Sequence, residues 1–313
     1  MNRKEKIARL QQNVNRDEAY YHRKHITTAN LLHNKFKSTI AATDTNHIAP
    51  KAVFGAFVAG APLTKFKPTE LMLRKAAKLG GTYNTKGVAI PVHVDMNAQD
   101  NMVHPPIELV KEAIRESGYR VIMNSCICRE MDDCKDYPHD IGCMFLGKAA
   151  KACVDHGSGH EATVEECLDH VDKAIAAGLS VGSYWVEFEQ YAWGFQDEDF
   201  PDFIAFCFCC PCCCHAIKFE NLAGGELKHL MYQSSGYHCE PIQYKCTGCG
   251  KCVSGCPRHF LKLGTNGTIT VDQNCAGCGL CLKHCPEGAL HVVQYAETKE
   301  HLKDYYEKLD ANW

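Results

Sequence analysis

Apolar residues alternate with other residues along 88–96, a period of two that predicts a strand with one apolar face. Proline cannot donate to a sheet ladder, so Pro91 predicts that this strand lies at a sheet edge or forms a bulge. His93 and Asp95 share the other face. They are candidates for a site pair, but we expect exposed polar residues there instead.

Two segments have the periodicity of amphipathic helices. The first begins at Pro105-Pro106, brings Ile107, Val110 and Ile114 to one face, and is expected to end before Gly118. A second helix is expected after Thr163, which together with Glu166 has the sequence pattern of a capping box. Cys167 lies on the apolar face of that helix. We therefore expect Cys167, and by the same default Cys153, to be buried thiols rather than metal ligands.

Further strands are expected at residues 119–123, 181–187 and 203–208, which are rich in apolar and aromatic side chains. The first and the third lead directly into cysteines. Residues 1–38 are basic and helix-prone, and we favour a solvated helix over a nucleic-acid-binding arm. A last amphipathic helix is expected within residues 296–313.

Composition then narrows the class of protein. The chain has 313 residues, 21 cysteines and a net charge of −3, and it opens with charged residues instead of a secretion signal. It is too long for a disulfide scaffold, and no run of about 18 apolar residues predicts a membrane span. The charge gives no indication of nucleic-acid binding. We expect a cytoplasmic protein whose thiols are mostly metal ligands.

One set of cysteines forms an internal repeat. Cys246, Cys249, Cys252 and Cys256-Pro257 recur 29 residues later as Cys275, Cys278, Cys281 and Cys285-Pro286. These runs resemble the bacterial ferredoxin pattern, in which the fourth cysteine of each run ligates the other cluster. One [4Fe–4S] cluster is therefore expected on Cys246, Cys249, Cys252 and Cys285, and a second on Cys275, Cys278, Cys281 and Cys256.

The residues between these cysteines suit the same interpretation. Gly248, Gly250, Gly277 and Gly279 allow the backbone to approach a cluster closely. Residues 264–271 contain an Asn-Gly turn and predict a hairpin between the two runs. A zinc ribbon is the alternative, but eight cysteines exceed the four ligands of a zinc site and leave the Cys-Pro pairs unexplained.

From about Gly236 to Val293 the chain resembles the bacterial-type two-cluster ferredoxins. The resemblance implies low-potential one-electron transfer. We accordingly expect an α+β protein with three parts. Residues 1–235 form an N-terminal α/β-type domain with a small sheet and flanking helices, residues 236–295 a ferredoxin-like domain, and residues 296–313 a closing helix.

Ten other cysteines form two dense groups, namely Cys126, Cys128, Cys134 and Cys143, then Cys207, Cys209, Cys210, Cys212, Cys213 and Cys214. Adjacent cysteines are poor ligands for a simple cubane held by one loop, because consecutive side chains diverge. Three interpretations remain: an additional Fe–S cluster held jointly by both groups, a dithiol site, or buried thiols. We favour the additional cluster. Arg129 is placed to neutralise its charge or to bind an anionic substrate.

The C-x-C-R-x4-C pattern, the later CFCCPCCC and the terminal repeat together resemble a group of ferredoxin-like iron–sulfur proteins of anaerobes. The resemblance extends over much of residues 101–293 and implies no particular reaction.

Two functions are compatible with these motifs. The first is electron transfer from the ferredoxin-like domain through two [4Fe–4S] clusters to the N-terminal site and a redox partner protein. Four basic residues expected to be exposed are candidates to guide docking, although an ordinary solvated surface is the default interpretation: Lys251, Arg258, Lys262 and Lys283. The second is an oxidoreductase that reduces a small molecule such as a disulfide at the N-terminal cysteines. Its candidate proton donors are His139, His156, His160 and His215. Sequence patterns for dinucleotide binding, phosphate binding and zinc proteolysis are absent.

Overall fold

The computed structural model describes residues 48–72, 86–92, 106–185, 189–196, 199–200, 203–225, 228, 232–234 and 236–295. The predictions for residues 1–38, His93, Asp95 and 296–313 lie outside these ranges.

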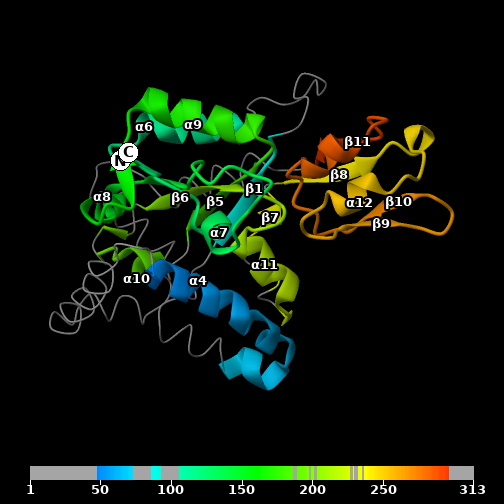
Figure 1. The fold of residues 1–313 in the computed structure, drawn as a ribbon. Helices are drawn as coiled ribbons and strands as arrows, with labels where there is room; N and C mark the ends of the chain where they lie inside the picture. Colours follow the sequence, from blue (N-terminus) through cyan, green and yellow to red (C-terminus); the bar gives the residue numbers. More distant parts are fainter. Residues whose placement is uncertain are drawn as a thin grey trace.

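A seven-stranded sheet forms the centre of the N-terminal part (Figure 1). Its order is β4 (Gly159–Glu161), β2 (Arg120–Met123), β3 (Met144–Leu146), β6 (Ile204–Cys209), β5 (Ser180–Trp185), β1 (Lys86–Ile90) and β7 (Gln233–Ser234). All neighbours are antiparallel except β1 and β7. The predicted edge position of the first strand is wrong, because β1 is paired on both sides. Pro91 is accommodated differently, since the strand ends at Ile90.

Helices cover both faces of this sheet. On one face, α6 (Pro106–Glu116) and α9 (Val164–Ala176) lie side by side (Figure 1). On the other, α4 (Ile48–Gly60) contacts α7 (Ile127–Met131), α10 (Glu189–Trp193) and α11 (His215–Leu222). Short elements complete this part: η1 (Ala61–Lys65), η3 (Lys148–Ala150) and α8 (Lys151–Asp155).

Several local predictions are confirmed. Thr163 and Glu166 form both hydrogen bonds of the capping box at the start of α9. Cys167 and Cys153 are buried at 0% and 1% exposure, as expected of packing thiols. The mixture of helices and antiparallel sheets is the expected α+β class. The sheet is larger than predicted, because three-residue strands such as β3 and β4 are too short to show a periodicity.

The repeat segment has its own buried core around Phe260, Leu261 and Leu290. Strand β8 (Tyr237–Pro241) pairs with β11 (Leu290–Gln294). Strand β9 (Leu261–Leu263) pairs with β10 (Ile269–Val271) as the predicted hairpin. The short helices are η6 (Gln243–Lys245), α12 (Lys251–Ser254) and η7 (Leu280–His284).

Arg258 attaches the repeat segment to α11. Its guanidinium lies 3.3 Å from the Glu220 carboxylate and donates hydrogen bonds to Asn221 Oδ1 at 2.8 Å and to the Lys228 carbonyl at 3.0 Å. The predicted exposure of Arg258 is therefore wrong, since only 5% of the residue is accessible. Lys251, Lys262 and Lys283 are exposed as expected.

Within the part of the chain that the structure describes, we find no helix with the length and apolar character needed to cross a membrane.

The buried Arg258–Glu220 pair gives a first prediction. Arg258→Ala leaves the Glu220 carboxylate buried without its main counter-charge, so we expect a loss of about 3–5 kcal/mol in the free energy of unfolding. Urea unfolding under anaerobic conditions measures it. Adding Glu220→Gln should recover part of the loss. Lys262→Ala, an exposed change in the same segment, should stay within about 0.5 kcal/mol. Equal effects of Arg258→Ala and Lys262→Ala would contradict this account.

Candidate metal centres

Four cysteines of the repeat surround one small cavity. Cys256, Cys275, Cys278 and Cys281 line it together with Cys239, Tyr232 and Phe260. These four are the ligand set expected for the second cluster. Burial raises the pKa of Cys275 and of Cys278 to about 12, so both are neutral thiols unless a cation compensates them. A buried set of this kind fits a bound metal cluster, which would hold the thiolates deprotonated.

The other expected ligand set lies nearer the surface. Cys252 is buried, Cys246 and Cys285 are half-buried, and Cys249 is exposed. Burial, then the charges of Cys281, Cys285 and Cys246, raise the pKa of Cys252 to about 11. The repeat is therefore asymmetric in its exposure, although its two halves have the same cysteine spacing.

The backbone repeats as well. Gly250 and Gly279 have φ of 73° and 81° and precede α12 and η7, while Gly248 and Gly277 both have φ of 68°. A Cβ atom on Gly277 would lie 2.5 Å from the Tyr237 carbonyl oxygen. The predicted need for glycine at these positions is thus confirmed.

Cys239 is a further member of this site that the sequence analysis does not identify. It lies alone in the sequence on β8, but its Sγ is 3.6 Å from Cys281 Sγ. No spacing rule connects it to the repeat, because it reaches the cavity only through the pairing of β8 with β11.

The two groups of N-terminal cysteines meet at the end of β6. A cluster held jointly by both groups, as expected from the sequence, would need this proximity. α7 and the loop after it carry Cys128 and Cys134, while Cys126 and Cys143 immediately precede α7 and β3. The second group runs from β6 through a turn to the start of α11. Within this region the sulfurs divide into two sets.

The inner set lines a cavity of about 50 Å³ beneath α4. It consists of Cys126, Cys128, Cys143, Cys207, Cys209 and Cys214. Two sulfur pairs are in contact, at 3.3 Å for Cys143–Cys207 and 3.0 Å for Cys209–Cys214. Phe54 and Phe57 of α4 contribute to the wall. We call this the six-cysteine pocket.

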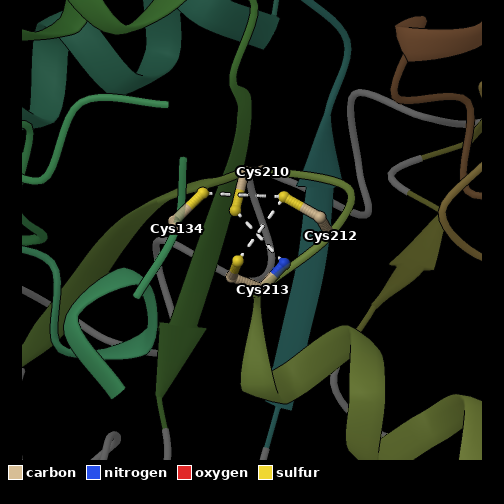
Figure 2. A group of neighbouring side chains, drawn as sticks. All are labelled: Cys134, Cys210, Cys212 and Cys213. Carbon is tan, nitrogen blue, oxygen red and sulfur yellow. Dashed lines mark hydrogen bonds between the residues drawn. The ribbon is translucent and has the colours of Figure 1, made fainter. Parts of the chain in front are cut away.

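The outer set consists of Cys134, Cys210, Cys212 and Cys213 (Figure 2). Their four Sγ atoms all lie within 4.8 Å of one another. We call this the four-sulfur group. Cys210 also borders the six-cysteine pocket.

Arg129 is a buried cation between the two sets. Its exposure is 0%, and its guanidinium donates to the carbonyls of Phe208, at 2.9 Å, and Ile141. Among the described residues it forms no ion pair with a carboxylate. The charges that raise its pKa are those of the cysteines, first Cys126 and then Cys210, although desolvation opposes them. The prediction that Arg129 neutralises charge at the cysteine site is consistent with this placement.

The same electrostatics act on Cys126. A hydrogen bond with Cys128, assisted by the charge of Arg129, lowers the pKa of Cys126 to about 6 in spite of its burial. Cys126 is therefore a thiolate at neutral pH, and a thiolate is the form that binds metals.

Buried polar atoms around the pocket have no hydrogen-bond partner among the described residues. They are Arg129 Nε, Glu189 Oε2, Trp193 Nε1 and His215 Nδ1, and all four residues line the pocket. Buried polar groups in folded proteins are normally satisfied. These four atoms, which lack a hydrogen-bond partner among the described residues, are therefore consistent with a pocket that binds a polar or charged group.

Of the four candidate histidines, the structure brings only His215 to this pocket. The Nε2–H of His139 donates to the Cys134 carbonyl at 2.8 Å. His160 is exposed, and His156 lies in a separate surface cavity beside α8. Glu189 is a buried acid of the pocket that the sequence analysis missed, because its aromatic-rich surroundings give no motif.

Comparison with known families supports the assignment of the repeat. A family model described as the 4Fe-4S dicluster domain matches residues 245–289. No curated protein and no solved structure matches the chain significantly. The C-terminal segment is therefore an iron–sulfur, ferredoxin-like module. Together with the cysteine-rich N-terminal site, it indicates a role in iron–sulfur electron transfer.

Glu189 gives a pH-dependent prediction. Burial raises its pKa from the ordinary 4.5 to about 8, so the folded chain keeps a proton that the unfolded chain has lost. This carboxyl therefore makes the fold less stable as pH rises from about 5 to about 8. Glu189→Gln removes the titration. The variant should gain roughly 1 kcal/mol per pH unit relative to wild type across this window.

Free energies of unfolding at about pH 5.5 and about pH 7.5 measure the gain. Glu112→Gln, at an exposed position of α6, is the control and should stay within about 0.5 kcal/mol of wild type at both values. A pH-independent difference for Glu189→Gln would show that the carboxyl is ionised in the fold.

Proposed function

We propose that this protein transfers electrons between a redox partner protein and the N-terminal cysteine site by way of its ferredoxin-like segment. Two [4Fe–4S] clusters would be held by the two cysteine sets of the repeat, and an additional Fe–S cluster by the six-cysteine pocket. Such clusters supply one-electron transfer at potentials set by their ligands and surroundings. The free thiols suit a reducing cytoplasm.

The observation that carries this proposal is a continuous connection between the two sites. The Tyr232 hydroxyl lies against the Cys278 sulfur and 3.1 Å from Ser180 Oγ, and its single proton is donated to one of the two at a time. Ser180 in turn donates to the Cys209 carbonyl at 3.2 Å. A ligand of the repeat and a cysteine of the pocket are thus joined through two side chains.

Exposure indicates where a partner would dock. Cys249 is exposed in the first ligand set, whereas Cys278 lies against the buried Tyr232 in the second. Lys245 and Lys251, within four residues of Cys249 in the sequence, are also exposed. We infer that a partner with an acidic surface meets the chain at the Cys249 side, and that the Cys278 side faces the interior.

Reduction of a small molecule is the second candidate function, and one observation favours it. The six-cysteine pocket contains a buried carboxyl, Glu189, and a buried imidazole, His215, each with an unpartnered atom among the described residues. A substrate that gains electrons there also needs protons, and these two groups are placed to hold them.

Iron content tests the additional cluster. Two cubanes contain about eight irons, so anaerobically purified protein should contain clearly more. Cys209→Ser should lower the content to about eight, whereas Cys167→Ser, at a packing thiol of α9, should leave it unchanged. Iron and acid-labile sulfide assays provide the counts. A wild-type content of about eight would exclude a third cluster.

The Tyr232 connection gives a separate prediction. A hydrogen bond to a cluster sulfur stabilises the reduced, more negative state. Tyr232→Phe should therefore lower one reduction potential by roughly 40 mV, the one-electron equivalent of about 1 kcal/mol. Iron content should not change. Potentiometric titration followed by electron paramagnetic resonance measures the shift.

Tyr295→Phe is the matched control, since Tyr295 is 47% exposed. Its potentials should equal those of wild type. Unchanged potentials in Tyr232→Phe would remove the hydroxyl from any role at the Cys278 sulfur.

A further inference from the structure

The four-sulfur group differs from the other cysteine sets in its dimensions. Cys212 Sγ lies 3.7 Å from Cys134 Sγ and 3.5 Å from Cys213 Sγ. All four sulfurs are mutually close and point toward a common centre (Figure 2). From the sequence, the side chains of consecutive cysteines are expected to diverge. The side chains of Cys212 and Cys213 instead converge.

These separations suit one ion. A metal–sulfur distance of about 2.3 Å in a tetrahedral site places the sulfurs about 3.8 Å apart. In a cubane each thiolate is bound to a different iron, so the four sulfurs lie at the corners of a larger figure. The four-sulfur group therefore matches a mononuclear tetrathiolate site and is too compact for a [4Fe–4S] cluster.

Backbone amides of two loops support thiolates at this position. The Cys213 N–H donates to Cys210 Sγ at 3.3 Å. The amides of Asp136 and Tyr137 donate to Cys134 Sγ. Each loop thus folds back on its own sulfur, and such hydrogen bonds stabilise the negative charge of metal-bound thiolates.

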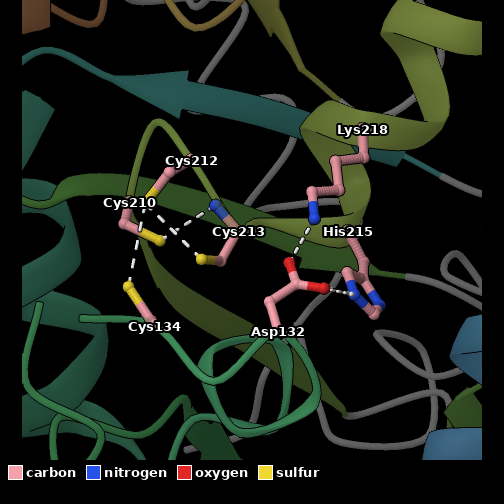
Figure 3. A network of polar contacts seen from close by, with 7 residues as sticks. All are labelled: Asp132, Cys134, Cys210, Cys212, Cys213, His215 and Lys218. Carbon is pink, nitrogen blue, oxygen red and sulfur yellow. Dashed lines mark hydrogen bonds and ion pairs between the residues drawn. The ribbon is translucent and has the colours of Figure 1, made fainter. Parts of the chain in front are cut away.

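One nearby cation offsets part of the charge of such a site. A divalent ion with four thiolates carries two negative charges. Arg129 lies against this group through its contact with Cys210. Lys218 also lies nearby, but its charge is already compensated by the ion pair with Asp132 (Figure 3). Asp132 is also 3.8 Å from His215, which lines the six-cysteine pocket.

We propose that Cys134, Cys210, Cys212 and Cys213 bind a single tetrahedral ion, Zn²⁺ or iron, at a structural site distinct from the six-cysteine pocket. The ion joins the loop after α7 to the turn between β6 and α11. Both segments carry cysteines of the pocket, so the ion fixes the pocket wall. This assignment is independent of the proposed electron transfer.

Metal analysis of the full-length, anaerobically purified protein tests the site. We expect about one equivalent of Zn²⁺, or of iron outside the clusters. For zinc, X-ray absorption at the zinc edge should show four sulfurs at about 2.3 Å and no neighbouring metal. For iron, whose absorption edge the cluster irons would dominate, Mössbauer spectroscopy should show a single high-spin iron bound by four thiolates, separate from the cluster signals. Either ion in this environment supports the proposal.

Variants locate the ion. Cys134→Ser should reduce the single ion from about one equivalent to below about a tenth, because a three-thiolate site binds more weakly. Cluster iron and acid-labile sulfide should stay at wild-type values. Cys153→Ser, at a packing thiol outside both sets, should lose neither. Cys209→Ser should lose cluster iron and keep the single ion.

Two results would overturn the proposal. One is loss of acid-labile sulfide in Cys134→Ser with the Cys209→Ser pattern, which would place the four sulfurs on a cluster. The other is wild-type protein without a mononuclear thiolate-bound ion, which metal analysis with zinc-edge absorption and Mössbauer spectroscopy detects without any variant. Neither result depends on whether the additional cluster of the proposed function exists.

Discussion

Charge balance around one buried arginine is the constraint on which the N-terminal part depends. Arg129 is inaccessible to water and has no carboxylate partner among the described residues. Burying an unpaired guanidinium is costly, so anions must be close. The groups around it that can supply negative charge are thiolates, and Cys126 is already ionised at neutral pH. Metal-bound thiolates in both sulfur sets would meet the same need. The positive charge of Arg129 thus stabilises thiolates in both sets, the six-cysteine pocket and the four-sulfur group.

A second constraint is positional. Arg258 and Glu220 form a buried ion pair that holds the repeat segment on α11, and α11 begins at the cysteine turn. The helix therefore begins at the N-terminal cysteines, and Glu220 near its other end contacts the repeat. The backbone N–H of Tyr232 donates to the Glu220 carboxylate, and the Tyr232 hydroxyl lies against Ser180 Oγ. The same carboxylate takes part in both attachments.

The features predicted correctly from the sequence are those encoded within a short stretch of chain. The capping box of α9, the hairpin of β9 and β10, and the glycines of the repeat all follow from local spacing. Other features depend on residues that meet only after folding. Cys239 reaches Cys281 through strand pairing, Arg258 is buried by α11, and Glu189 joins the pocket from a helix without a motif. The division of ten cysteines into six and four likewise depends on how two loops meet, and the spacing within either group does not reveal it.

The close sulfur pairs have a consequence for the maturation of the protein. Cys209 and Cys214 lie 3.0 Å apart, Cys143 and Cys207 3.3 Å, and Cys239 and Cys281 3.6 Å. In a folded chain that lacks metal, each pair is close enough for an oxidant to couple the two thiols after a small movement. A disulfide in either of the first two pairs would take two sulfurs from the six-cysteine pocket, and one in the third pair would take Cys281 from the repeat. If these sulfurs bind metal as we propose, metal insertion would have to precede contact with oxidants, and the order of assembly would matter as much as the final geometry.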